Sequence, residues 1–132
     1  MSRVIAAMVE LVVRCCDPQE VLVFGSYAKS RQRVDSDVDL LVLCEARDPR
    51  ALEWEIADLL AGFPVDVDVL VRPPGSMAAA WVERGSFMQS ILSSARPVFV
   101  RSGVSVLQGL RPRPRGLTNS APEVQLAGRR NL

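Results

Sequence analysis

Two short apolar segments of the chain carry aspartates at alternate positions, and this pattern constrains the fold more than any other feature. The segment DVDLLVLC holds Asp37 and Asp39, and the segment VDVDVLV holds Asp66 and Asp68. Side chains alternate across a strand, so each pair shares one face, with Cα atoms about 6.6 Å apart. Like charges on one face are unfavourable. If the two strands are neighbours with these faces aligned, the carboxylates must hold protons or cations.

The ligand types available in the chain indicate which cation this would be. Carboxylate oxygens are hard ligands that suit Mg²⁺ or Mn²⁺. The chain has no histidine, and its three cysteines, Cys15, Cys16 and Cys44, show no C-x-x-C spacing. This argues against a zinc site and excludes the usual histidine-dependent triads. An odd number of cysteines also fits a reducing cytosol better than a disulfide framework, so we expect a cytoplasmic protein.

A glycine-serine corner precedes the first aspartate pair. The buried-strand pattern EVLVFG stops at Gly25, and Ser26 can cap a short helix or turn in SYAKSRQR. Glycine lets the backbone approach a ligand closely, and amides at a helix start donate to phosphate. Lys29 offers a counter-charge. The spacing matches neither a P-loop nor a dinucleotide fingerprint, so the corner becomes specific only in combination with the aspartates.

Helix and strand patterns alternate along the first 102 residues. An apolar stripe over residues 4–13 predicts a helix. The segment DPRALEWEIADLLAG predicts another, with Asp48 as the N-cap, Pro49 in first position and Gly62 as the C-terminal cap. Further helices are predicted in MAAAWVERG, capped by Ser76, and in SFMQSILSSA, before a last strand in PVFV. We expect an α/β or α+β fold, a small mixed sheet covered by helices.

The last thirty residues differ from the rest in charge and pattern. Residues 1–102 carry 11 basic and 14 acidic side chains, whereas residues 103–132 carry 5 and 1. The segment 103–132 also has three prolines, four glycines and no apolar stripe, which predicts a mostly irregular or disordered tail behind a domain of residues 1–102. Its RPRPRG stretch could contact nucleic acid, but a solvated tail is favoured. We find no signal peptide and no membrane span.

The motifs together resemble the nucleotidyltransferase superfamily related to polymerase β. Its pattern is a strand ending in Gly-Ser, an Asp-x-Asp on the next strand and a third acid on a later strand. The stretch FGSYAKSRQRVDSDVDLLV is similar to that of the minimal nucleotidyltransferases, which are often encoded beside a HEPN-domain partner. The resemblance covers roughly residues 3–101 and implies the polymerase-β-like fold. It implies that Gly25 and Ser26 hold the nucleotide phosphates and that Asp37 and Asp39 bind two Mg²⁺ ions.

The third acid is left open between Asp68 and Asp66. Asp68 is preferred because an apolar run, VLV, follows it directly, as in similar strands. The acid chosen is the expected proton acceptor. The chain departs from the family at Ser30, where glycine is common, which could slow turnover without removing a metal ligand.

The resemblance implies a magnesium-dependent enzyme that transfers AMP from ATP to a hydroxyl of a partner protein. In that reading the chain is the antitoxin of a HEPN toxin–antitoxin pair. One alternative is transfer to a small molecule, as in aminoglycoside nucleotidyltransferases. Another is a catalytically weak protein that neutralises its partner by binding.

Overall fold

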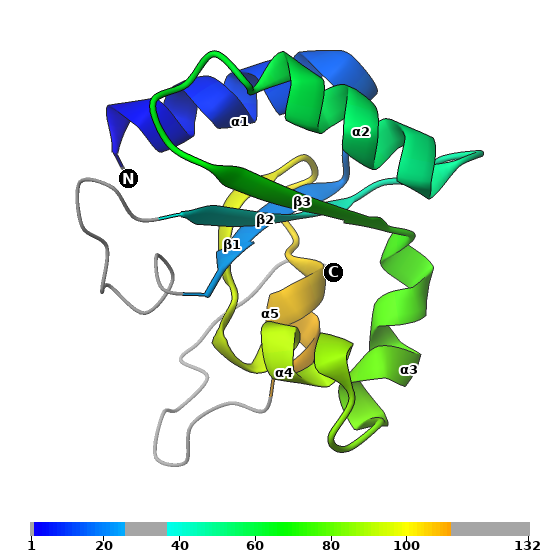
Figure 1. Ribbon diagram of the computed structural model, residues 1–132. Helices are drawn as coiled ribbons and strands as arrows, with labels where there is room; N and C mark the ends of the chain where they lie inside the picture. Colours follow the sequence, from blue (N-terminus) through cyan, green and yellow to red (C-terminus); the bar gives the residue numbers. More distant parts are fainter. Residues whose placement is uncertain (1, 26–36, 112–132) are drawn as a thin grey trace.

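A computed structural model describes residues 2–25 and 37–111 of the chain, which form a four-stranded sheet between two layers of helices (Figure 1). The helices are α1 (Arg3–Cys16), α2 (Pro49–Leu59), α3 (Met77–Val82), α4 (Phe87–Ser94) and α5 (Val106–Leu110), with a 3₁₀ turn η1 (Pro74–Ser76). The strands are β1 (Glu20–Phe24), β2 (Val38–Leu43), β3 (Val67–Arg72) and β4 (Arg96–Val100).

The sheet is mixed, with strand order β3-β2-β1-β4. β1 is antiparallel to both β2 and β4, whereas β2 and β3 run parallel. A parallel pair needs a long crossover, and α2 supplies it. The predicted fold class, a small mixed sheet covered by helices, is confirmed.

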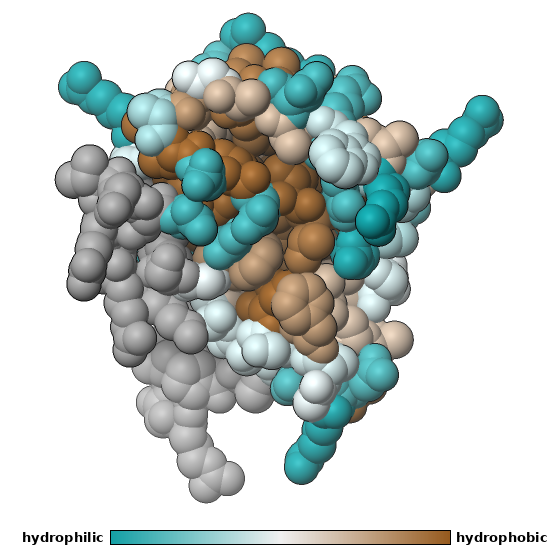
Figure 2. All heavy atoms as spheres, in the orientation of Figure 1, coloured by the Kyte–Doolittle hydropathy of each residue, from teal (hydrophilic) through white to brown (hydrophobic). Residues whose placement is uncertain are grey.

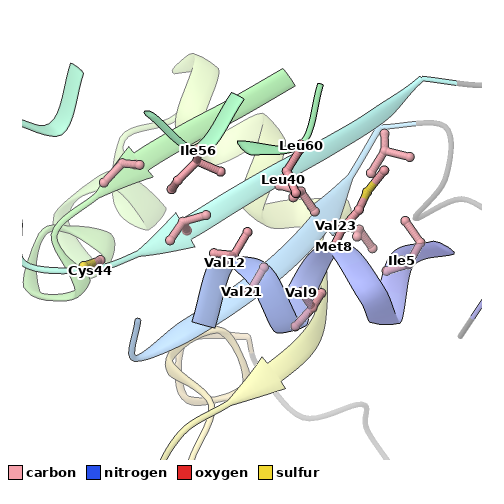
Figure 3. Packing of buried hydrophobic residues seen from close by; sticks show 13 residues of the cluster. Ile5, Met8, Val9, Val12, Val21, Val23, Leu40, Cys44, Ile56 and Leu60 are labelled. Atoms are coloured by element: carbon pink, nitrogen blue, oxygen red, sulfur yellow. The ribbon is translucent and has the colours of Figure 1, made fainter. Parts of the chain in front are cut away.

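Alternating side chains of β2 enter two different apolar cores. Leu40 and Val42 are buried with residues of α1 and α2, whereas Leu41 and Leu43 are buried with residues of α3, α4 and α5. Figure 3 shows the first core, where residues from α1 and α2 gather over the sheet. By the same alternation, Asp39 lies on the α3–α5 side of the sheet.

The local signals for helix boundaries are confirmed in part. The side chain of Asp48 accepts a hydrogen bond from the Ala51 N–H at 3.1 Å, and α2 begins at Pro49 as predicted. The C-terminal cap is Leu60 rather than Gly62, so that prediction is wrong. Ser76 is the N-cap residue of α3 as predicted, but its side chain makes no capping hydrogen bond; its hydroxyl donates instead to the Pro73 carbonyl at 2.8 Å.

A short helix follows the last strand and is anchored by a buried acid. Glu20 at the start of β1 is fully buried, and its carboxyl group accepts from the Ser105 hydroxyl at 2.6 Å and the Val106 N–H at 2.7 Å. Leu107 of this helix is buried in the second core. The segment from residue 103, for which a mostly irregular chain is predicted, therefore contains one short helix, α5, and residues 112–132 lie outside the described residues.

The three cysteines are free thiols. Burial, with a smaller effect from the neighbouring Cys44 thiol, raises the pKa of Cys16 to about 12.

No helix in the described part of the chain is long and apolar enough to cross a membrane.

Candidate active site

Asp39 of β2 and Asp68 of β3 lie directly opposite each other. The parallel register pairs the two residues, so their side chains share one face of the sheet. Asp68 is close enough to Asp39 to act on the charge of its carboxyl group. The Asp39 side chain is half-buried, and that of Asp68 is exposed. The two acids therefore form one site open to solvent on the side of Asp68.

The surroundings of Asp39 make its negative charge unfavourable. Burial is the largest cause, followed by the charge of Asp68 and its hydrogen bond, and then by the charge of Asp37; together they raise the pKa of Asp39 to about 6. A carboxyl group with such neighbours takes up either a proton or a metal cation. The paired acids thus have the electrostatic character of a cation site.

Gly25 places bare backbone against the same carboxyl group. It follows the last residue of β1, Phe24, which pairs with Asp39. Gly25 has a φ of +74°, and a methyl group added to its Cα would overlap Oδ2 of Asp39. Only glycine accepts both the positive φ and this contact. The bare backbone at the end of β1 therefore lies directly against the Asp39 carboxyl group.

The structure separates the two candidates for the third acid. Asp66 precedes β3, its side chain is exposed, and its carbonyl accepts a hydrogen bond from the Val38 N–H at 2.9 Å. It is not among the groups that raise the pKa of Asp39, whereas Asp68 and Asp37 both are. Geometry therefore associates Asp68, and not Asp66, with Asp39.

Two predicted nucleotide-binding residues, Ser26 and Lys29, lie outside the described residues, as does Ser30. Asp37 is described, with an exposed side chain just before β2.

The paired acids fit part of a site for a hard divalent cation. Over residues 2–25 and 37–111, no three histidine, cysteine, aspartate or glutamate side chains are gathered tightly enough to hold a metal ion. Asp39 and Asp68 nevertheless present adjacent carboxyl oxygens, which Mg²⁺ and Mn²⁺ prefer. A cation bound there would remove the repulsion that raises the pKa of Asp39.

A hollow next to Asp68 contains residues that the sequence patterns did not single out. It has a volume of about 260 Å³ and lies between α2 and β3, with Arg50, Glu53 and Trp54 on the helix side. Trp54 is 72% exposed. Its position off the apolar stripe of α2 is the signal by which the sequence could have pointed to it.

A family profile described as a nucleotidyltransferase domain matches residues 1–92, which include the whole Gly25–Asp39–Asp68 arrangement. This chain belongs to the nucleotidyltransferase domain family. No curated protein matches this nucleotidyltransferase.

Two solved structures share the fold of this nucleotidyltransferase. A toxin–antitoxin structure with AMP-PNP aligns with a TM-score of 0.50 and 20% identity, over 71% of this chain and 72% of that one. A Sulfolobus solfataricus protein assigned as a nucleotidyltransferase aligns with a TM-score of 0.50 and 19% identity, over 76% of this chain and 81% of that one. Identity at this level indicates a common fold.

Proposed function

We propose that this nucleotidyltransferase transfers AMP from ATP to a hydroxyl group of a partner protein. One observation carries the proposal: three adjacent strands bring Gly25, Asp39 and Asp68 together at one end of the sheet. Bare backbone beside two paired carboxyl groups suits a phosphate that binds together with a cation. Transfer of a nucleotidyl group requires both ligands at one place.

In the proposed site, the acids divide between metal binding and proton transfer. Asp37, Asp39 and Asp68 would hold Mg²⁺, or Mn²⁺ in its place, and the bound ions would neutralise charge and make the acceptor hydroxyl more acidic. Asp68 is proposed as the third acid and proton acceptor: the hydroxyl oxygen bonds to the α-phosphorus of ATP, pyrophosphate leaves, and the hydroxyl proton passes to Asp68. Its register with Asp39 supports it over Asp66, whose side chain has no part in the electrostatics of Asp39.

The phosphate side of the site is proposed at the corner after β1. Gly25 and Ser26 would hold the β and γ phosphates, and Lys29 would supply a counter-charge. The support for Gly25 is that its backbone, which carries no side chain, lies against the Asp39 carboxyl group. Preference for ATP rests on the family resemblance and on the AMP-PNP of the toxin–antitoxin structure with the same fold.

The acceptor is proposed to be a toxin of the HEPN type, for which this chain is the cytoplasmic antitoxin. The motif FGSYAKSRQRVDSDVDLLV is similar to that of minimal nucleotidyltransferases paired with HEPN proteins. A toxin–antitoxin structure with the same fold is in keeping with this role. The free thiols also suit a reducing compartment.

Label transfer tests the function directly. The chain is incubated with ATP labelled at the α-phosphate, Mg²⁺ and a co-expressed HEPN protein encoded beside it, and labelled protein is separated by electrophoresis. We expect Asp39→Asn and Asp68→Asn to reduce labelling at least about 100-fold, because each removes a charge that the transition state needs. Asp66→Asn is the matched control and is expected to retain most of the activity.

The same variants separate catalysis from inhibition by binding. Neutralisation of the toxin in cells should fail with Asp39→Asn if AMP transfer is the mechanism. Full neutralisation by this variant, with no label on the partner protein, would contradict the proposed function and favour neutralisation by binding.

A further inference from the structure

The outer edge of β3 is a surface that the proposed catalytic residues do not use. β3 is the terminal strand of the sheet and lies at the front of Figure 1, below α2. The carbonyls of Asp66 and Arg72 accept hydrogen bonds from N–H groups of the β2 side at 2.9 and 3.0 Å. Successive residues of a strand direct their backbone groups to opposite sides, so Val67, Val69 and Val71 direct theirs outward.

Only half of this edge is capped from within the chain. Oε2 of Glu53 accepts from the Val71 N–H at 2.9 Å, and the Arg72 guanidinium donates to the Val71 carbonyl at 2.8 Å. Within the described part of the chain, no strand or side chain pairs with the outer backbone groups of Val67 and Val69. These two residues therefore offer hydrogen-bonding groups to an added strand.

A hollow runs beside the uncapped half. The 260 Å³ hollow is lined by Trp54 together with Val67 and Val69. A second hollow of about 480 Å³ shares Ala57 and Val67 with it and reaches Asp66. In Figure 2 the surface around α2 and β3 is a hydrophobic band crossed by hydrophilic side chains. The band and the open edge together suit an extended segment with alternating apolar side chains.

The order of the site residues across the sheet indicates from which side an acceptor arrives. Gly25 ends β1, Asp39 lies on β2 and Asp68 lies on β3, so the three follow one another across adjacent strands. In phosphoryl and nucleotidyl transfer the attacking and leaving oxygens are roughly in line. If the leaving phosphates bind at Gly25, the attacking hydroxyl approaches from the side of Asp68, where β3 has its open edge.

We propose that the acceptor protein presents its hydroxyl on an extended segment that adds to the edge of β3 at Val67 and Val69. An apolar side chain of this segment packs against Trp54. The backbone hydrogen bonds set the register, and the register places the hydroxyl beside Asp68. The exposed Asp66 favours a lysine or arginine near the hydroxyl residue. The inference rests on the proposed function and adds how the enzyme recognises its acceptor protein.

Nuclear magnetic resonance on the ¹⁵N-labelled full chain tests the docking, with Mg²⁺ and a non-hydrolysable ATP analogue present. The probe is an acetylated peptide in which valine and lysine alternate around one tyrosine. We expect shifts and slowed hydrogen exchange at the amides of Val67 and Val69, and a shift of the Trp54 indole. Val69→Pro and Trp54→Ala should each raise the Kd about fivefold or more, since each removes an interaction of about 1 kcal/mol. Phe87→Ala, also exposed but on α4, is the control and should leave the Kd unchanged.

A parallel assay with ATP separates this inference from the proposed function. AMP transfer to the peptide tyrosine that falls in Val69→Pro and Trp54→Ala, but not in Phe87→Ala, would support both. Transfer that is unchanged in Val69→Pro and Trp54→Ala, or peptide-induced shifts that avoid β3, would overturn docking at the edge and leave the proposed function standing. Absence of transfer to peptide and partner protein alike would overturn the proposed function and the inference together.

Discussion

Gly25 is the residue at which backbone conformation and site chemistry depend on each other most closely. Its φ of +74° and its contact with Oδ2 of Asp39 leave no room for a side chain. Gly25→Ala is expected to lower the free energy of unfolding by about 1–3 kcal/mol, since it adds both backbone strain and overlap. Urea denaturation measures the change. Gly62→Ala is the matched control, because open space surrounds Gly62; an equal loss in both variants would contradict the role given to Gly25.

The pH dependence of stability tests whether the fold makes the negative charge of a single residue, Asp39, unfavourable. Its pKa is raised from 3.8 to about 6 in the folded chain, so the folded state binds its proton more tightly than the unfolded state does. The protonated Asp39 carboxyl group therefore contributes fully to the stability of the fold below about pH 4, and this contribution is lost as the pH rises through 6. Without divalent metal, we expect Asp39→Asn to be more stable than the wild type at pH 8 but not at pH 4. Thermal melts in EDTA measure this; a stability difference that does not change with pH would contradict it.

At the scale of single elements, α5 depends on a contact between residues far apart in the sequence. Ser105 caps the helix by accepting from the Gln108 N–H at 3.2 Å while its hydroxyl donates to the buried Glu20. Ser105→Ala is expected to cost about 1–2 kcal/mol, because it removes the cap and leaves one oxygen of Glu20 without its hydroxyl donor. Ser102→Ala, at an exposed position, should change stability by less than about 0.5 kcal/mol. Equal effects in urea denaturation would show that the Glu20 contact does not stabilise α5.

The elements also show what local sequence patterns can and cannot predict. α2 was predictable because Asp48, Pro49 and an apolar stripe act within one helix. α5 was not, because its five residues have no stripe and its anchor, Glu20, is 85 residues away from Ser105. The cap at Leu60 in place of Gly62 shows that a glycine just beyond an apolar stripe does not by itself determine where a helix ends.

At the scale of the whole molecule, the site exists only through the order of the strands. The alternating aspartates predicted two acidic strand faces, and the resemblance predicted that they meet. Alternation alone could not choose between Asp66 and Asp68, since both lie on the same face of one segment. The parallel register of β2 and β3 makes the choice by pairing Asp39 with Asp68. That register depends on the crossover through α2 and on the apolar residues of both faces, which no single motif encodes.

The central claim is that Gly25, Asp39 and Asp68 form one site for a nucleotide with its metal, and calorimetric titration with Mg²⁺ and a non-hydrolysable ATP analogue tests it most directly. The wild type should bind the pair, and Asp39→Asn and Asp68→Asn should each weaken binding about tenfold or more, a loss of about 1.4 kcal/mol. Asp66→Asn should bind within about twofold of the wild type. Unchanged affinity in Asp39→Asn and Asp68→Asn, or a loss in Asp66→Asn as large as in Asp68→Asn, would contradict the account.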